Sequence, residues 1–190
     1  MAGGRRAILL FALRALAWLG PCLAAWYFAS SALAWAPVRV AGPLLSIAGL
    51  EVERSKVEDG LATFEAQVEA PYRPGAPAGQ GAVIGIDVKT RPFTFGLALF
   101  AALVLAAGRP WRPAAWALGG AALVLLPAWG ITFDALRQVA SVREIAGILG
   151  WAPLAREAIA FGYQAGSLLL PTLAPVGLWV SLDPRFARPG

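Results

Sequence analysis

Four long apolar segments constrain the fold of this 190-residue chain more than any other feature. A helix needs about 17–25 mostly apolar residues to cross the hydrocarbon core of a bilayer. Overall, 58% of the residues are hydrophobic and 14% are charged, against about 45–50% and about 25% in soluble domains. We therefore expect a mainly α membrane protein with four transmembrane helices, over residues 7–36, 92–108, 114–133 and 158–182.

The connection between the first two segments, residues 37–91, is long enough to form a small domain. It begins with an amphipathic piece, 38–50, which we expect to lie on the membrane surface. The alternating stretch LEVERSKVEDGLATFEAQVEA then predicts two strands joined at Glu58-Asp59-Gly60, and AVIGIDVKT predicts a third. A small antiparallel β-sheet of about three strands should therefore lie between helices one and two, followed by the rest of the chain in a three-helix region, 92–190.

The connection between the third and fourth segments predicts a second extramembrane element. Apolar residues recur at helical spacing over residues 134–155, with Asp134 as a possible N-cap. This pattern indicates a short amphipathic helix on the same side of the membrane as the sheet. Residues 1–36 then form the N-terminal transmembrane helix, 37–91 the amphipathic segment and β domain, and 92–190 the remainder.

Basic residues near the ends of the apolar segments predict the orientation. The N-terminus, the RPWRP turn and the C-terminus together hold six arginines and one acid. Residues 37–91 and 134–157 hold nine basic and ten acidic residues. Since Lys and Arg gather on the cytoplasmic side, we expect both termini and the RPWRP turn in the cytoplasm. This distribution also accounts for the net charge of +5, so nucleic-acid binding is not expected.

The first segment has a second interpretation, as a cleaved signal peptide with an A-x-A site at Ala32-Leu33-Ala34. Its apolar stretch is much longer than the about 7–15 residues of a signal-peptide core. An uncleaved membrane anchor is therefore favoured. The single Cys22 lies inside this segment and is interpreted as a small buried hydrophobic residue.

Catalysis by this chain alone is not expected. The chain has no histidine, which excludes Ser–His and Cys–His dyads and histidine metal sites. Ser55 and Lys56 are neighbours on a predicted strand and point to opposite faces. An intramembrane aspartyl protease needs aspartates within helices, but the four here fall in loops or at helix ends: Asp59, Asp87, Asp134 and Asp183. We expect no catalytic residue, no cofactor and no metal.

Helix packing is the chemistry that the fourth segment retains. Gly162 and Gly166 form a GxxxG pair, which lets another backbone approach closely. Tyr163 and Gln164 flank this pair and can hydrogen-bond across it. Two interpretations stay open: the glycine face packs against helices of this protein, or it contacts a separate membrane protein. Arg156 and Glu157 precede the segment and are interpreted as an anchor at the headgroups.

Two stretches, AWGITFDALRQVA (128–140) and GWAPLAREAIAFGYQAGSLLLPTLAPVGLWVSLDPRF (150–186), carry a recognisable pattern. Its positions are Trp129, Gly130, Phe133, Ala135, Leu136, Arg137, Gln138, Arg156, Glu157, Gly162, Tyr163, Gln164, Gly166, Pro171, Ala174, Pro175, Arg185 and Phe186. The pattern resembles the exosortase H-associated membrane proteins, small bacterial inner-membrane proteins encoded beside exosortase H.

The resemblance implies a non-catalytic accessory protein in the bacterial inner membrane, with residues 37–91 and 134–157 in the periplasm. Its implied partner is exosortase H, the C-terminal helix of the exosortase substrate, or both. Exosortases resemble transpeptidases that use Cys, Arg and His, and a chain without histidine cannot be that enzyme. The alternatives are an assembly or chaperone subunit of a pilus or secretion apparatus, and a small transporter or pore.

Overall fold

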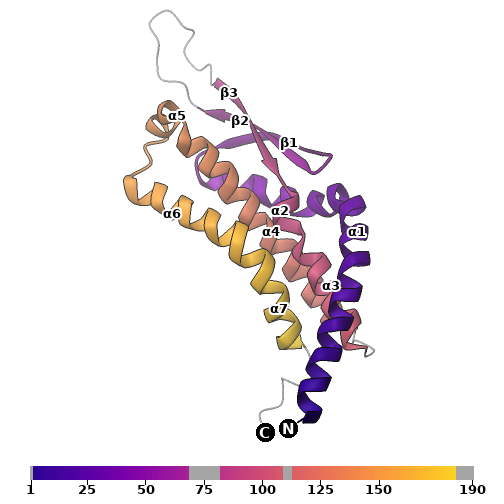
Figure 1. Ribbon diagram of the computed structural model, residues 1–190. Coiled ribbons are helices and arrows are strands. Elements are labelled where there is room, and N and C mark those ends of the chain that lie inside the picture. The colour runs from indigo at the N-terminus through magenta and orange to yellow at the C-terminus, as the bar shows by residue number, and fades with distance from the viewer. Residues whose placement is uncertain (1, 69–81, 109–112, 183–190) are drawn as a thin grey trace, which may run out of the picture.

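The computed structural model describes residues 2–68, 82–108 and 113–182, and it is mostly helical with one small sheet (Figure 1). In chain order the elements are α1 Ala2–Ile47, β1 Glu51–Glu58, β2 Leu61–Val68, β3 Ala82–Lys89, α2 Arg91–Thr94, α3 Gly96–Ala107, α4 Pro113–Ser141, α5 Arg143–Ile148, α6 Pro153–Gln164, the π-helix η1 Ala165–Leu169, and α7 Leu170–Leu182. The YRPGAPAGQG loop, most of the RPWRP turn, Asp183, Arg185 and Phe186 lie outside the described residues.

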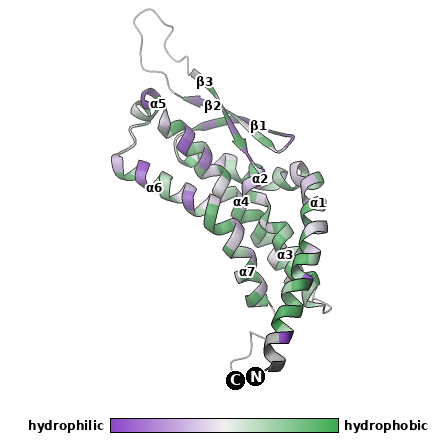
Figure 2. Ribbon diagram, viewed as in Figure 1, coloured by the Kyte–Doolittle hydropathy of each residue, from purple (hydrophilic) through white to green (hydrophobic). Residues whose placement is uncertain are grey.

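Three helices are long and apolar enough to cross a membrane: Arg6–Ile47, Ala117–Ser141 and Pro153–Leu182. The remaining predicted segment, 92–108, corresponds to α2 and α3, a shorter apolar stretch over Arg91–Ala107. Apolar residues gather on α3, α7 and the first parts of α1 and α4, whereas polar residues gather on the sheet and α5 (Figure 2). The start of α1 and the end of α7 lie at one end of the molecule, where Phe11 stacks on Trp179 at 5.2 Å.

Helix α1 runs 11 residues beyond the predicted end at residue 36, and it contains Pro37 and Pro43. A proline removes one helical hydrogen bond and bends a helix, and the last part of α1 turns to pass beneath the sheet (Figure 1). There Val38, Ala41 and Leu45 are buried in the core shared with the sheet. Burial against the sheet stabilises the part of α1 that follows Pro37. The periodicity of the α1 sequence does not reveal this contact, because the sheet is formed by residues later in the chain.

Helix α4 also runs further than predicted, to Ser141. The prediction that Asp134 is the N-cap of a separate helix is wrong, because Asp134 lies inside α4 and its carboxylate accepts a hydrogen bond from Arg137 at 2.9 Å. Leu136 and Val139 continue the buried face of α4, so no break is needed. The separate short helix is α5, which begins at Arg143.

The predicted three-stranded antiparallel sheet is confirmed, with the order β1-β2-β3. Phe64 at its centre pairs with Ser55 on one side and Ile86 on the other. The alternation of β2 and β3 puts one face against α1 and α4: Ala62, Phe64, Ala66, Val68, Ile86 and Val88 are buried. Burial on one face gives this thin sheet the support that three strands alone would lack.

The turn between β1 and β2 links the sheet to the helices. Asp59 and Gly60 both have positive φ, 49° and 77°, the conformation of a two-residue hairpin turn. The Gly60 amide donates to Ser31 Oγ on α1 at 3.1 Å, and the Gly60 carbonyl accepts from the Thr90 amide at 2.8 Å. An added Cβ on Gly60 would lie 2.8 Å from Arg91 Nε.

Replacing Gly60 with alanine should therefore lower the stability of the whole protein. Left-handed backbone costs a residue with a Cβ about 1–2 kcal/mol, and the Cβ would also displace Arg91. Thermal unfolding in detergent should show a midpoint lowered by several degrees. Gly85→Ala in β3 is the control, because nothing lies within 4 Å of its added Cβ. Equal midpoints for the two variants would contradict the strained turn.

Candidate helix-packing and partner site

Glycines allow α4 and the α6–η1 helix to pack at very close range. A Cβ added to Gly166 would lie 2.7 Å from the Cα of Gly130, so the two backbones touch at this point. A Cβ on Gly162 would overlap the Phe133 ring, and one on Gly130 would overlap the Phe93 ring of α2. Both residues of the GxxxG pair thus face α4 of the same chain. Close backbone approach is what small residues provide in membrane helix pairs.

The indole of Trp129 adds a polar link across the same interface. Its Nε1 donates to the carbonyl of Gly162 at 3.1 Å, and its ring lies 4.5 Å from that of Phe133. Gly162 is buried at the end of α6, just before the π-helix η1. Pro171 has no amide to donate and its ring crowds the preceding turn, which a wider π turn accommodates. The Gly162 carbonyl also accepts from the Ala165 amide, so the indole of Trp129 is a second donor to it.

A polar cluster closes the end of this interface nearest the sheet. Arg137 Nη2 lies 2.9 Å from Asp134 Oδ1, and the guanidinium lies 4.3 Å over the ring of Tyr163. Gln138 Nε2 donates to the backbone carbonyl of Asp87 on β3 at 2.9 Å. Asp134 is largely buried, with a side chain 12% exposed, so Arg137 compensates a carboxylate that would otherwise be costly. The cluster ties α4 to α6 and to the sheet.

Gln164 differs from its neighbours, because it lies on the outward side of α6. Its side chain is exposed and forms no hydrogen bond within the part of the chain that the structure describes. Phe161 and Leu168 lie one turn before and after it, and they are 71% and 67% exposed. These three residues form what we call the outward face. Of the four predicted packing residues, three thus lie toward α4 and one points away.

A model of the family described as exosortase H-associated membrane protein matches residues 5–186. The chain belongs to this family. No curated protein and no solved structure matches it. The resemblance carried by the last third of the sequence is thereby confirmed, and it extends over nearly the whole chain.

The family pattern of this exosortase H-associated protein falls mainly at helix contacts. Trp129, Gly130 and Phe133 lie in the α4–α6 interface, and Arg137 and Gln138 lie in the polar cluster above it. Pro171 and Pro175 are buried against α3, where a Cβ on Gly96 would lie 2.8 Å from the Pro171 carbonyl.

Arg156 and Glu157 make no such contact. Both are exposed on α6 and form no ion pair among the described residues. The pattern therefore contains inward residues that hold the fold and a smaller outward group that does not.

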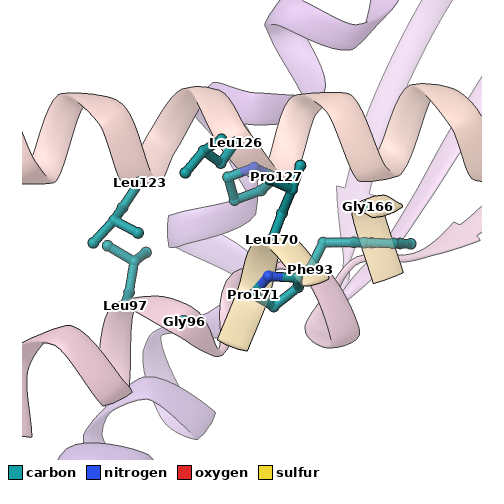
Figure 3. A pocket seen from close by; sticks show the side chains of 9 residues that line it. All are labelled: Phe93, Gly96, Leu97, Leu123, Leu126, Pro127, Gly166, Leu170 and Pro171. Carbon is teal, nitrogen blue, oxygen red and sulfur yellow. The ribbon is translucent and has the colours of Figure 1, made fainter. Parts of the chain in front are cut away.

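A small apolar pocket lies beside this interface (Figure 3). Residues of α2, α3, α4, η1 and α7 line it. No polar side chain lines it; the lining residues are Phe93, Gly96, Leu97, Leu123, Leu126, Pro127, Gly166, Leu170 and Pro171. Such a lining offers no group to orient a polar substrate. We interpret the pocket as imperfect packing around the bends at Pro127 and Pro171.

The polar groups of the sheet give no support to catalysis either. Lys56 bonds to Glu58 at 2.8 Å, and this hydrogen bond and charge raise the pKa of the lysine. A lysine that serves as a general base needs a lowered pKa. Within the described residues no three Cys, Asp or Glu side chains gather as metal ligands would.

Sequence reasoning missed two residues at the closest helix–helix contacts, Gly96 and Phe93. Both face other helices at the closest approaches, Gly96 to Pro171 and Phe93 to Gly130. A lone glycine in an apolar helix was the available signal for Gly96, since glycine there is costly unless close packing uses it. Nothing in the local sequence distinguishes Phe93 from the other phenylalanines.

Proposed function

We propose that this protein is a non-catalytic accessory subunit that binds exosortase H in the inner membrane through the outward face of Phe161, Gln164 and Leu168. The family match supports the link to exosortase H. It favours this role over the pilus-assembly and transporter alternatives. The proposed orientation has both termini cytoplasmic, four membrane crossings including α2–α3, and the sheet and α5 periplasmic.

The observation that carries the choice of surface is the position of Gln164. Gly162 contacts Phe133 and Gly166 contacts Gly130, so Gln164 lies between these two levels of α4, at most four residues or about 6 Å from the level of the buried Asp134. Its neighbours Phe161 and Leu168 are apolar and exposed, as expected for residues in contact with lipid tails. An amide that lies among exposed apolar side chains at the edge of the hydrocarbon is costly when it finds no partner. A transmembrane helix of the partner that carries a hydrogen-bonding side chain would satisfy it.

The packing of the glycines supports the same choice by elimination. Gly162 and Gly166 are occupied by Phe133 and Gly130 of α4, so they are not free to receive a second protein. Tyr163 is covered by Arg137. Arg156 and Glu157 are also exposed and unpaired on α6, but they lie in its first two turns. Among the described residues of α6 and η1, Gln164 is the exposed polar residue without a hydrogen bond that lies between two exposed apolar residues, Phe161 and Leu168.

Photo-crosslinking in cells tests the proposed surface. A photoreactive phenylalanine analogue at position Phe161 or Leu168 should crosslink to exosortase H when both proteins are produced. The control is the same analogue at Leu16, which is 66% exposed on α1, on the opposite side of the bundle from α6. Crosslinks of equal yield from all three positions, or none from Phe161 and Leu168, would show that the surface is wrong.

A further inference from the structure

Two arginines, one on α1 and one at the start of α2, stack on aromatic rings of α1. The Arg91 guanidinium, at the start of α2, lies 4.7 Å over the ring of Tyr27 and its Nε contacts Ser30 Oγ at 3.4 Å. The Arg39 guanidinium lies 5.0 Å over the ring of Trp35. Among the residues that the structure describes, neither arginine forms an ion pair with a carboxylate. Each therefore has several guanidinium N–H groups left for another acceptor.

Both arginines lie where the headgroups of one leaflet are expected. Counted from Arg6, about 20 helical residues at a rise of 1.5 Å span the hydrocarbon core of about 30 Å. This brings the boundary of the core to about Trp26 and Tyr27. Tyr and Trp prefer this level in membrane proteins, and Tyr27 and Trp35 are 52% and 58% exposed. Phosphate groups of phospholipids occupy the same level.

The helix beyond this boundary has a second apolar side. While Val38, Ala41 and Leu45 are buried under the sheet, the exposed side carries Phe28, Val40, Leu44 and Ile47, with Phe28 and Ile47 more than 80% exposed. Exposed apolar residues on the same helix as the cation Arg39 are typical of a segment that lies in the membrane interface. The same part of α1 thus combines exposed apolar side chains with Arg39, which has no carboxylate partner among the described residues.

We propose that α1 from Tyr27 to Ile47 lies in the headgroup region of the bilayer, and that Arg39 and Arg91 each bind the phosphate of an anionic phospholipid. Guanidinium groups recognise phosphate oxygens through paired hydrogen bonds. Stacking on Tyr27 and Trp35 holds each guanidinium flat and in place before the lipid binds. This proposal is independent of any exosortase contact, because it uses no residue of the outward face.

The test is a lipid titration of the full-length protein, purified in detergent and stripped of lipid. Phosphatidylglycerol should raise the thermal unfolding midpoint of the wild type by several degrees, whereas diacylglycerol and inorganic phosphate should not. An arginine near an anionic surface contributes about fivefold in affinity. The double variant Arg39→Gln/Arg91→Gln should therefore need about 25-fold more phosphatidylglycerol. Arg54→Gln, an exposed arginine on β1, is the control for charge and should behave as the wild type.

Arg91 also contacts Ser30, so its variant could fold poorly. The single variant Arg39→Gln changes an exposed position and should still fold. Its affinity for phosphatidylglycerol should be about fivefold weaker than that of the wild type. A wild-type titration curve for Arg39→Gln would overturn the proposal. So would an equal midpoint shift from diacylglycerol, which lacks the phosphate, or from inorganic phosphate, which lacks the lipid.

Discussion

Replacing Gly166 with alanine is expected to destabilise this protein by about 1–3 kcal/mol, the usual cost of an added group in a filled core. The new Cβ would lie 2.7 Å from the Cα of Gly130 and 3.2 Å from Trp129 Cδ1. Gly130 is a backbone neighbour and cannot rotate away as a side chain can. The helices α4 and η1 would have to separate, which would also weaken the hydrogen bond from Trp129 to Gly162.

The matched control is Gly177→Ala on α7. Nothing lies within 4 Å of a Cβ at that position, and it belongs to the same continuous helix, Pro153–Leu182. Alanine also has a better helix propensity than glycine, by about 1 kcal/mol, so Gly177→Ala should match or exceed the stability of the wild type. Both variants are compared by thermal unfolding in detergent. A Gly166→Ala midpoint equal to that of Gly177→Ala would mean that the close contact does not form.

The sequence was a good guide to elements whose pattern is local. Alternation in residues 61–68 predicted a strand, because side chains on a strand point to opposite faces, and its apolar side is the buried one in the structure. Asp59-Gly60 predicted the hairpin turn through its preference for positive φ. The three strands and the hairpin turn could therefore be predicted before any contact between distant residues was known.

The ends of the helices could not be predicted, since distant residues determine them. Pro37 indicates an end of helix, but Val38 and Leu45 are buried under a sheet formed later in the chain. Asp134 looks like a cap, but Arg137 and Gln138 on the same helix bind it. In both cases a tertiary contact outweighs a local preference, and neither contact is visible in a single segment.

The GxxxG motif shows a similar limit for the candidate site. Its spacing indicated a close helix contact but left open whether the second helix belonged to this chain. The structure brings Gly162 and Gly166 against Phe133 and Gly130, and it leaves Gln164 on the other side. A rotation of about 200° between residues 162 and 164 of a helix separates the two sides. The partner contact therefore has to be sought at Gln164 and not at the glycines.

Replacing Gln164 with leucine should leave the protein folded and weaken its binding to exosortase H. Leucine suits an exposed position between Phe161 and Leu168, so the thermal midpoint should not fall. Hydrogen bonds between membrane helices are worth about 0.6–2 kcal/mol, which corresponds to binding about threefold to thirtyfold weaker. The control is Thr172→Val, because the Thr172 hydroxyl already donates to the Leu168 carbonyl at 2.7 Å and offers little to a partner.

Quantitative co-purification of exosortase H with these variants, from membranes that contain both proteins at matched levels, tests the central claim most directly. We expect wild type and Thr172→Val to retain equal amounts of exosortase H, and Gln164→Leu to retain at least threefold less while it unfolds at the wild-type temperature. Full retention by a folded Gln164→Leu variant would contradict docking through the outward face of α6 and η1.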